Sequence, residues 1–157
     1  MRKKAMTKAF EPEIVVFCCN YCSYAAADLA GSIRMDYPPN VKIIHVPCSG
    51  RVDAITLLRT LEAGADGVYV TGCMEGDCHF VTGNYKAKKR VAYVKKLVAD
   101  AGMEPERVQM FNISASDAPL FAEVARQMTE IIRKLGPNPI RPEGSGVIKN
   151  DPAGKAA

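Results

Sequence analysis

Six cysteines are the residues of this 157-residue chain best suited to chemistry, and all of them lie in its first half. Thiolates bind zinc and iron–sulfur clusters, and four of them complete either kind of site. Zinc usually takes paired C-x2-C knuckles, whereas this chain has one C-x2-C, then an isolated cysteine and a C-x4-C. The spacing therefore favours a cluster, although it matches no ferredoxin pattern. The cysteines are Cys18, Cys19, Cys22, Cys48, Cys73 and Cys78.

Two different roles for the thiols stay open. The positively charged N-terminus has no apolar stretch behind it, so we expect a cytoplasmic protein with reduced thiols and no disulfide scaffold. A dithiol oxidoreductase using Cys19 and Cys22 would leave the three later cysteines without a role. A zinc-stabilised interaction domain would use the same thiols without redox chemistry. Cys18 is equally consistent with a small buried hydrophobic residue and with a member of the site.

The elements that must position these thiols alternate between strand and helix. Short β-branched runs predict strands, and apolar residues at spacings of three and four predict helices. Four such β-α units indicate an α/β fold: a single flavodoxin-like, Rossmann-like domain whose parallel four-stranded sheet has the order 2-1-3-4 and helices on both faces. The predicted strands are 14–18, 41–46, 67–71 and 107–112; the predicted helices are 24–35, 52–62, 85–101 and a last one capped by Ser116 that ends at 135.

Cysteines follow each of the first three predicted strands. The carboxyl ends of parallel strands meet at one edge of the sheet, where open α/β sheets place their binding sites. We therefore expect the thiols of these three loops to meet. His45 is predicted to be packed, and His79 to be a hydrogen-bond donor to the site. The Gly-rich phosphate loop of a nucleotide-binding version is absent after the first strand. The candidate cofactor and metal ligands are Cys19, Cys22, Cys48, Cys73 and Cys78.

Composition restricts the class of protein. A chain with 48% hydrophobic and 24% charged residues is an ordinary globular domain. A net charge of +4 without tryptophan gives no argument for nucleic acid, and no apolar run is long enough to span a membrane. We divide the chain into a basic N-terminal extension (1–12), a domain that carries the cysteines (13–136) and a Pro/Gly-rich tail (137–157). Basic residues from Lys86 to Lys96 form either a solvated helix face or a docking surface for an acidic partner.

Several motifs in the same order resemble the iron–sulfur delta subunit of methyl-viologen-reducing [NiFe] hydrogenases, from about Ile14 to Leu135. Many members of that family have a further cysteine before Gly72, where this chain has Thr71, so that thiol cannot be essential to a common function. The motifs are Phe17-Cys-Cys-Asn-Tyr-Cys-Ser-Tyr24, Tyr37-Pro-Pro-Asn40, Pro47-Cys-Ser-Gly-Arg51, Gly64-Ala-Asp-Gly67, Gly72-Cys73, Gly76-Asp-Cys-His79 and Gly83-Asn-Tyr-Lys86.

The resemblance implies one 2Fe-2S cluster, with four of the five candidate thiols as iron ligands. It implies an electron-transfer subunit of an oxidoreductase complex that performs no substrate chemistry of its own. Its partners would be the flavin subunit of a heterodisulfide-reductase-like complex and a second oxidoreductase: a hydrogenase, a formate dehydrogenase or a methylene-tetrahydrofolate reductase. The absence of a Ser/His/Asp set and of a phosphate loop agrees with this expectation.

Overall fold

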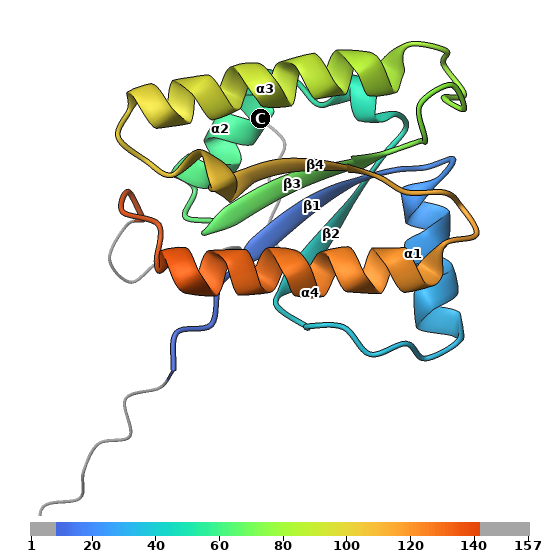
Figure 1. Ribbon diagram of the computed structural model, residues 1–157, viewed down its shortest axis with the longest axis horizontal. Coiled ribbons are helices and arrows are strands. Elements are labelled where there is room, and N and C mark those ends of the chain that lie inside the picture. The colour runs from blue at the N-terminus through green and yellow to red at the C-terminus, as the bar shows by residue number, and fades with distance from the viewer. Residues whose placement is uncertain (1–8, 142–157) are drawn as a thin grey trace, which may run out of the picture.

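The protein folds around one four-stranded sheet with helices on both faces (Figure 1). The computed structural model describes residues 9–141 of the 157. All described strand pairs are parallel, and the strand order is β2-β1-β3-β4. The predicted α/β class and strand order are therefore confirmed. The strands are β1 (Ile14–Cys19), β2 (Val41–Val46), β3 (Gly67–Gly72) and β4 (Val108–Asn112); the helices are α1 (Ser23–Ser32), α2 (Ala54–Glu62), α3 (Gly83–Asp100) and α4 (Ala118–Leu135), with 3-10 turns η1 (Ser49–Arg51) and η2 (Pro105–Arg107).

The two central strands, β1 and β3, are buried along their whole length, as their continuous apolar runs predict. Alternate residues of β1 face opposite layers. Ile14 and Val16 pack with α1 and α4, whereas Val15 and Phe17 pack with α2 and α3. Because all four strands are parallel, their carboxyl ends lie at one edge of the sheet, at the right of Figure 1. The loops that carry the cysteines lie at this edge.

Helix ends differ from prediction where a local cap decides them. Asp117, not Ser116, caps α4, because its carboxylate accepts the Leu120 backbone N–H at 3.1 Å. Helix α1 ends at Ser32 instead of continuing to Met35, because Arg34 adopts the left-handed conformation (φ 55°). No helix among the described residues is both long enough and apolar enough to cross a membrane.

The first residues of the predicted tail pack against the opposite edge of the sheet. Asn138 is buried, and its side-chain amide donates to the carbonyls of Leu61 and Ala65, each at 2.8 Å. The buried Asp66 carboxylate accepts the Asn138 backbone N–H at 2.9 Å and pairs with Arg141 at 3.2 Å. Residues 137–141 thus close the base of the domain. Most of the predicted extension and the rest of the tail lie outside the described residues, and the domain division stays a prediction.

Candidate metal centre

Three buried thiols from two loops form the centre of the site. Cys19 is the last residue of β1, Cys22 precedes α1, and Cys73 directly follows β3. Their sulfur atoms all lie within 4.8 Å of one another, and Cys19 Sγ and Cys73 Sγ are 3.8 Å apart. The topology therefore brings together thiols that are 54 residues apart in sequence.

Cys48 and Cys78 complete the group from a third loop and from the β3–α3 loop. Cys78 packs against the three central cysteines. Both sulfur atoms lie close to Gly83, the first residue of α3. A β carbon added to Gly83 would stand 2.3 Å from Cys48 Sγ and 3.3 Å from Cys78 Sγ. The structure thus gathers all five candidate ligands at the carboxyl edge of the sheet.

The spacing of the sulfur atoms fits metal coordination. A metal–thiolate bond of about 2.3 Å in tetrahedral geometry places two ligand sulfurs about 3.8 Å apart. The 3.8 Å between Cys19 Sγ and Cys73 Sγ equals that value without any rearrangement. Five thiols exceed the four that a tetrahedral metal or a cluster needs. The donor set therefore fits a thiolate-bound metal or iron–sulfur cluster.

The ends of helices make the site electropositive. Cys22 stands at the N-cap of α1 and Cys48 at the N-cap of η1, while the N-terminus of α3 abuts Cys48 and Cys78. The first turns of α1 and α3 contain no acidic residue that would neutralise the partial positive charge of these helix N-termini. This arrangement stabilises thiolates, the form in which cysteine binds metal.

Hydrogen bonds and burial shift the pKa values of the thiols in different directions. A hydrogen bond from the Cys22 thiol, opposed by burial, lowers the pKa of Cys19 to about 5, with help from the backbone N–H groups of Tyr21 and Ser49. The same interaction with Cys19 raises the pKa of Cys22. Burial raises the pKa of Cys48, although the Gly50 backbone N–H reaches its sulfur at 3.4 Å. Hydrogen bonding therefore favours the thiolate form of Cys19 over that of Cys22.

Cys18 lies apart from this group. Its side chain is fully buried in the layer packed against α1 and α4, and it accepts the Thr71 hydroxyl at 3.4 Å. Burial raises the pKa of this thiol to about 11. The structure favours a packing role for Cys18 over membership of the site.

Glycines let the three loops approach one another. A β carbon on Gly50 would stand 2.8 Å from the Gly83 Cα, and one on Gly72 would stand 2.9 Å from Ser49 Oγ. Any larger residue would separate η1 from α3 or from the end of β3. The Ser49 hydroxyl in this junction is buried and has no hydrogen-bond partner among the described residues.

Two asparagines that sequence reasoning missed fix the backbone at Cys73. The side-chain amides of Asn84 and Asn112 both donate to the Cys73 carbonyl, at 3.2 Å and 2.5 Å, and Asn84 also reaches the Met74 carbonyl at 3.0 Å. Asn84 belongs to a motif that begins at Gly83, but nothing in the sequence pattern marks Asn112, which ends β4. Both asparagines hold the β3–α3 loop in place from outside it.

The two histidines contribute differently from each other. The ring of His45 is exposed on the edge strand β2, where it stacks on Tyr24 and hydrogen-bonds Asn20 Oδ1 at 2.7 Å, so the prediction that it is packed is wrong as to burial. The ring of His79 is also exposed and stacks on Tyr21 at 3.8 Å. Burial raises the pKa of Cys73, and the His79 backbone N–H acts in the opposite direction. Among the described contacts, the backbone of His79 interacts with the site and its ring packs at the rim.

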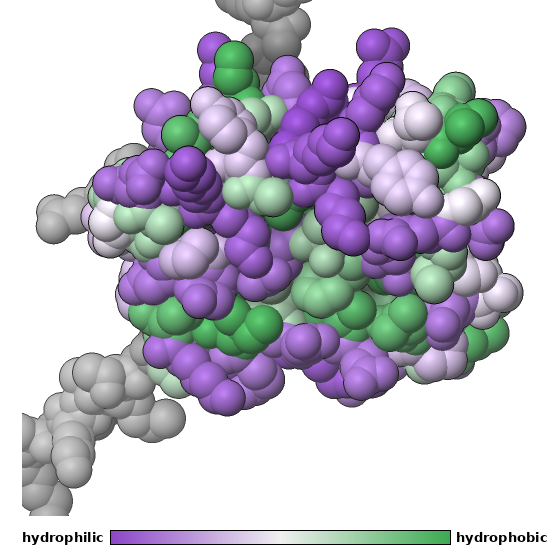
Figure 2. Space-filling view, turned by 45° about the horizontal axis from the view of Figure 1, so that its top comes forward, coloured by the Kyte–Doolittle hydropathy of each residue, from purple (hydrophilic) through white to green (hydrophobic). Residues whose placement is uncertain are grey.

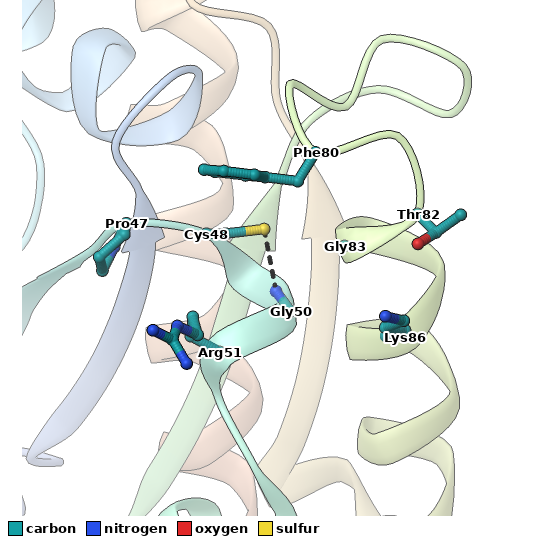
Figure 3. Close-up of a pocket in the computed structure, with 8 residues that line it drawn as sticks. All are labelled: Pro47, Cys48, Gly50, Arg51, Phe80, Thr82, Gly83 and Lys86. Atoms are coloured by element: carbon teal, nitrogen blue, oxygen red, sulfur yellow. Dashed lines mark hydrogen bonds between the residues drawn. The ribbon is translucent and has the colours of Figure 1, made fainter.

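A hollow of about 300 Å³ opens beside Cys48. Figure 3 shows the Phe80 ring above the Cys48 sulfur, with Arg51 extending from η1 and Lys86 from α3. Hydrophilic side chains cover most of the face in Figure 2, and hydrophobic groups form a band across its lower half, with smaller groups near its upper corners. The thiols are largely buried, but this hollow leads to Cys48, and a second hollow, of about 340 Å³, is lined in part by Cys22 and Cys73. The lining residues are Pro47, Cys48, Gly50, Arg51, Phe80, Thr82, Gly83 and Lys86.

Known proteins resemble almost all of the folded part of the chain. The family described as methyl-viologen-reducing hydrogenase, delta subunit, matches residues 14–136. The iron-sulfur subunit of the F420-non-reducing hydrogenase of Archaeoglobus profundus is 52% identical over 132 residues, which cover 84% of this chain and 96% of that protein. The vhu iron-sulfur subunit of the F420-non-reducing hydrogenase of Methanococcus maripaludis is 46% identical over 131 residues, 83% of this chain and 98% of its own length.

A relative of another kind contains a similar region inside a longer chain. One polypeptide of the ferredoxin/F420H2-dependent CoB-CoM heterodisulfide reductase of Methanosarcina acetivorans is 39% identical over 137 residues. That stretch covers 87% of this chain but only 17% of the reductase polypeptide. In that protein, a region like this chain is covalently joined to a heterodisulfide reductase polypeptide.

Proposed function

Since the chain belongs to the family of delta subunits of methyl-viologen-reducing hydrogenases, which are components of oxidoreductase complexes, we propose that it carries one 2Fe-2S cluster and relays electrons between two partner proteins. The observation that carries this proposal is the convergence of five cysteines on one edge of the sheet. Core packing alone does not require thiols from separate loops to meet.

We assign the iron ligands to four of the five residues Cys19, Cys22, Cys48, Cys73 and Cys78. The 3.8 Å separation of Cys19 and Cys73 supports ligation of one metal by both. The contact of Cys48 and Cys78 with Gly83 supports a second pair on the other side of the group. A bound cluster would supply a carrier for single electrons.

The residues of the chain hold and tune that carrier. Helix N-termini and backbone N–H groups stabilise negative charge on the sulfur atoms, which is one of the factors that set the potential of an iron–sulfur site. Burial keeps water from the thiolates. The chain therefore acts by position and electrostatics and performs no bond chemistry on a substrate.

The relatives suggest the partners. One side would be the flavin subunit of a heterodisulfide-reductase-like complex, because a similar region forms part of a heterodisulfide reductase polypeptide. The other side would be an oxidoreductase such as a hydrogenase, a formate dehydrogenase or a methylene-tetrahydrofolate reductase, of which the names of the relatives favour the hydrogenase. A cytoplasmic location stays a prediction.

A dithiol oxidoreductase is the strongest alternative, because the lowered pKa of Cys19 beside a helix N-terminus is typical of such enzymes. Access argues against it. Cys19 is 1% exposed and Cys22 is 5% exposed, so very little of either residue is open to attack on a disulfide substrate.

Metal analysis separates the functions. The full chain, purified without oxygen, should contain iron and acid-labile sulfide in equal amounts and give a paramagnetic signal on reduction. Zinc in a colourless protein would establish the interaction domain, and turnover of a disulfide without metal would establish the dithiol enzyme.

A further inference from the structure

The hollow beside Cys48 is flanked by two cationic side chains. Arg51 and Lys86 are exposed and form no ion pair with any other described residue. Two basic neighbours on α3 are engaged elsewhere: Arg90 donates to the backbone carbonyls of Gly50 and Val52, and Lys88 pairs with Glu75 at 2.7 Å. Of the basic residues from Lys86 to Lys96, it is Lys86 that lines the hollow, and together with Arg51 it presents a charge without an ion-pair partner there.

Exposed apolar groups complete the rim of the hollow. The Phe80 ring lies above the Cys48 sulfur (Figure 3) and is 50% exposed. Val81, the next residue in the chain, is 74% exposed. Val81 also has a φ of 63°, a conformation that is unfavourable for a β-branched residue. Clustered exposed apolar side chains in a soluble domain commonly mark a contact surface. Here they stand beside positive charge and directly over a thiol.

We propose that this hollow, the Arg51–Lys86 hollow, receives an acidic segment of a redox partner. A partner carboxylate would lie between the two cations, and an apolar partner residue would lie against Phe80. The proposal rests on the proposed function, since the purpose of such docking is to bring a partner's cofactor close to Cys48. Positive charge at the entrance would also steer an acidic partner toward the site and raise its association rate.

Zero-length cross-linking of the native complex tests which chemistry occupies the hollow. A carbodiimide joins a lysine amine to a carboxylate that already touches it, and peptide mass spectrometry identifies both residues. We expect Lys86 to be joined to an aspartate or glutamate of another polypeptide. A complex in which Lys86 stays unmodified, or is joined only to carboxylates of its own chain, would overturn the proposal.

Charge reversal in the isolated, cluster-containing chain gives a second test. The rate of oxidation of the reduced protein is measured with anionic tris(oxalato)cobaltate(III) and with cationic hexaamminecobalt(III). At low salt, Arg51→Glu with Lys86→Glu should slow the anion roughly tenfold or more and accelerate the cation. Lys96→Glu with Lys134→Glu, the same total charge change near the ends of α3 and α4, should alter both rates much less. Equal effects of the two double reversals would show that Arg51 and Lys86 create no local positive potential at the hollow, and would refute the proposal. The iron content measured on each sample shows separately whether the cluster is present.

An independent observation concerns Ser49. Its hydroxyl is 1% exposed, has no hydrogen-bond partner among the described residues, and lies against Gly72 at the end of β3. A buried donor without a partner is costly and calls for an acceptor. The Ser49 backbone N–H already acts on Cys19. We infer that the Ser49 hydroxyl donates to a sulfur atom of the bound iron–sulfur group, so that Ser49 is a positioning residue that raises its reduction potential.

Substitution of Ser49 by alanine removes the donor without adding volume. In Ser49→Ala, the midpoint potential should move to a more negative value, because hydrogen bonds to sulfur stabilise the reduced state. Ser49→Thr, which keeps the hydroxyl, should move the potential less. If the hydroxyl is idle, Ser49→Ala will leave the potential unchanged and raise the melting temperature, and that pair of results would overturn the inference.

Discussion

Substitution of Gly83 by alanine should displace Cys48 from the site by the addition of a single carbon atom. The new β carbon would stand 2.3 Å from Cys48 Sγ, whereas a relaxed contact between such atoms is about 3.5 Å. One of the two must therefore move by roughly 1.2 Å. Metal–ligand distances tolerate only about 0.2 Å, so Cys48 could no longer serve as a ligand in its present position.

Helix propensity and overpacking change the free energy of unfolding of Gly83→Ala in opposite directions. The backbone of Gly83 is not left-handed, so alanine is sterically allowed there and would by itself gain about 0.5–1 kcal/mol in a helix. Overpacking costs typically about 1–3 kcal/mol. We therefore expect the free energy of unfolding of the metal-free chain to fall by about 1–2 kcal/mol in Gly83→Ala.

Gly31 offers a matched control. It lies in α1 with nothing within 4 Å of an added β carbon, so Gly31→Ala should stabilise the chain by about 0.5–1 kcal/mol and leave the iron content intact. Denaturant unfolding and iron analysis of both variants measure the contrast. In a Cys48→Ala background the clash with Cys48 Sγ disappears and the 3.3 Å contact with Cys78 Sγ remains, so Gly83→Ala should lower the free energy of unfolding much less than it does in the wild-type chain. A Gly83→Ala protein that keeps its iron and its stability would refute the reasoning.

Three further predictions follow from the placement of single side chains. Cys19→Ser or Cys48→Ser should lower the iron and sulfide content per chain, whereas Cys18→Ser should keep it, because Cys18 lies in the core; loss of iron from the Cys18 variant would contradict this placement. Burial raises the pKa of Cys18 to about 11, above the value of about 8.5 for an unfolded thiol. The stability that the protonated Cys18 thiol contributes is therefore complete below about pH 8.5 and is lost as the pH rises toward 11. Iodoacetamide at about pH 9 should accordingly leave Cys18 unmodified in the folded protein, as mass spectrometry would show. Asp66→Ala should reduce the free energy of unfolding by about 3–5 kcal/mol, because it leaves two backbone N–H groups without their acceptor and removes one of the two carboxylates that pair with Arg141, yet the iron content of the folded protein should not change; a stability loss under about 1 kcal/mol would show that the base network is dispensable.

The sequence predicts the convergence of the cysteines because topology alone produces it. Continuous apolar runs identify β1 and β3 as central strands, and parallel strands must share one carboxyl edge. The residues that follow those strands, Cys19 and Cys73, are thereby brought together before any side-chain contact is known.

The details of the site depend on contacts that no local pattern records. Asn112 reaches the Cys73 carbonyl from a neighbouring strand 39 residues later, and Arg90 holds η1 from α3 across 40 residues. The predicted tail is similar: its Pro/Gly-rich composition hides Asn138, which is buried through hydrogen bonds to residues 72 to 77 positions earlier. Such pairs are set by packing between elements, which hydrophobic periodicity does not encode.

The identity of the metal group tests the central claim most directly. Elemental analysis and electron paramagnetic resonance of the anaerobically purified full chain should find iron and labile sulfide in equal amounts, with the signal of a two-iron two-sulfur cluster after reduction. The signal should vanish when Cys19 and Cys73, the pair at 3.8 Å, are both replaced by serine. A colourless protein that holds zinc alone, or one that keeps its full cluster in that double variant, would contradict the claim.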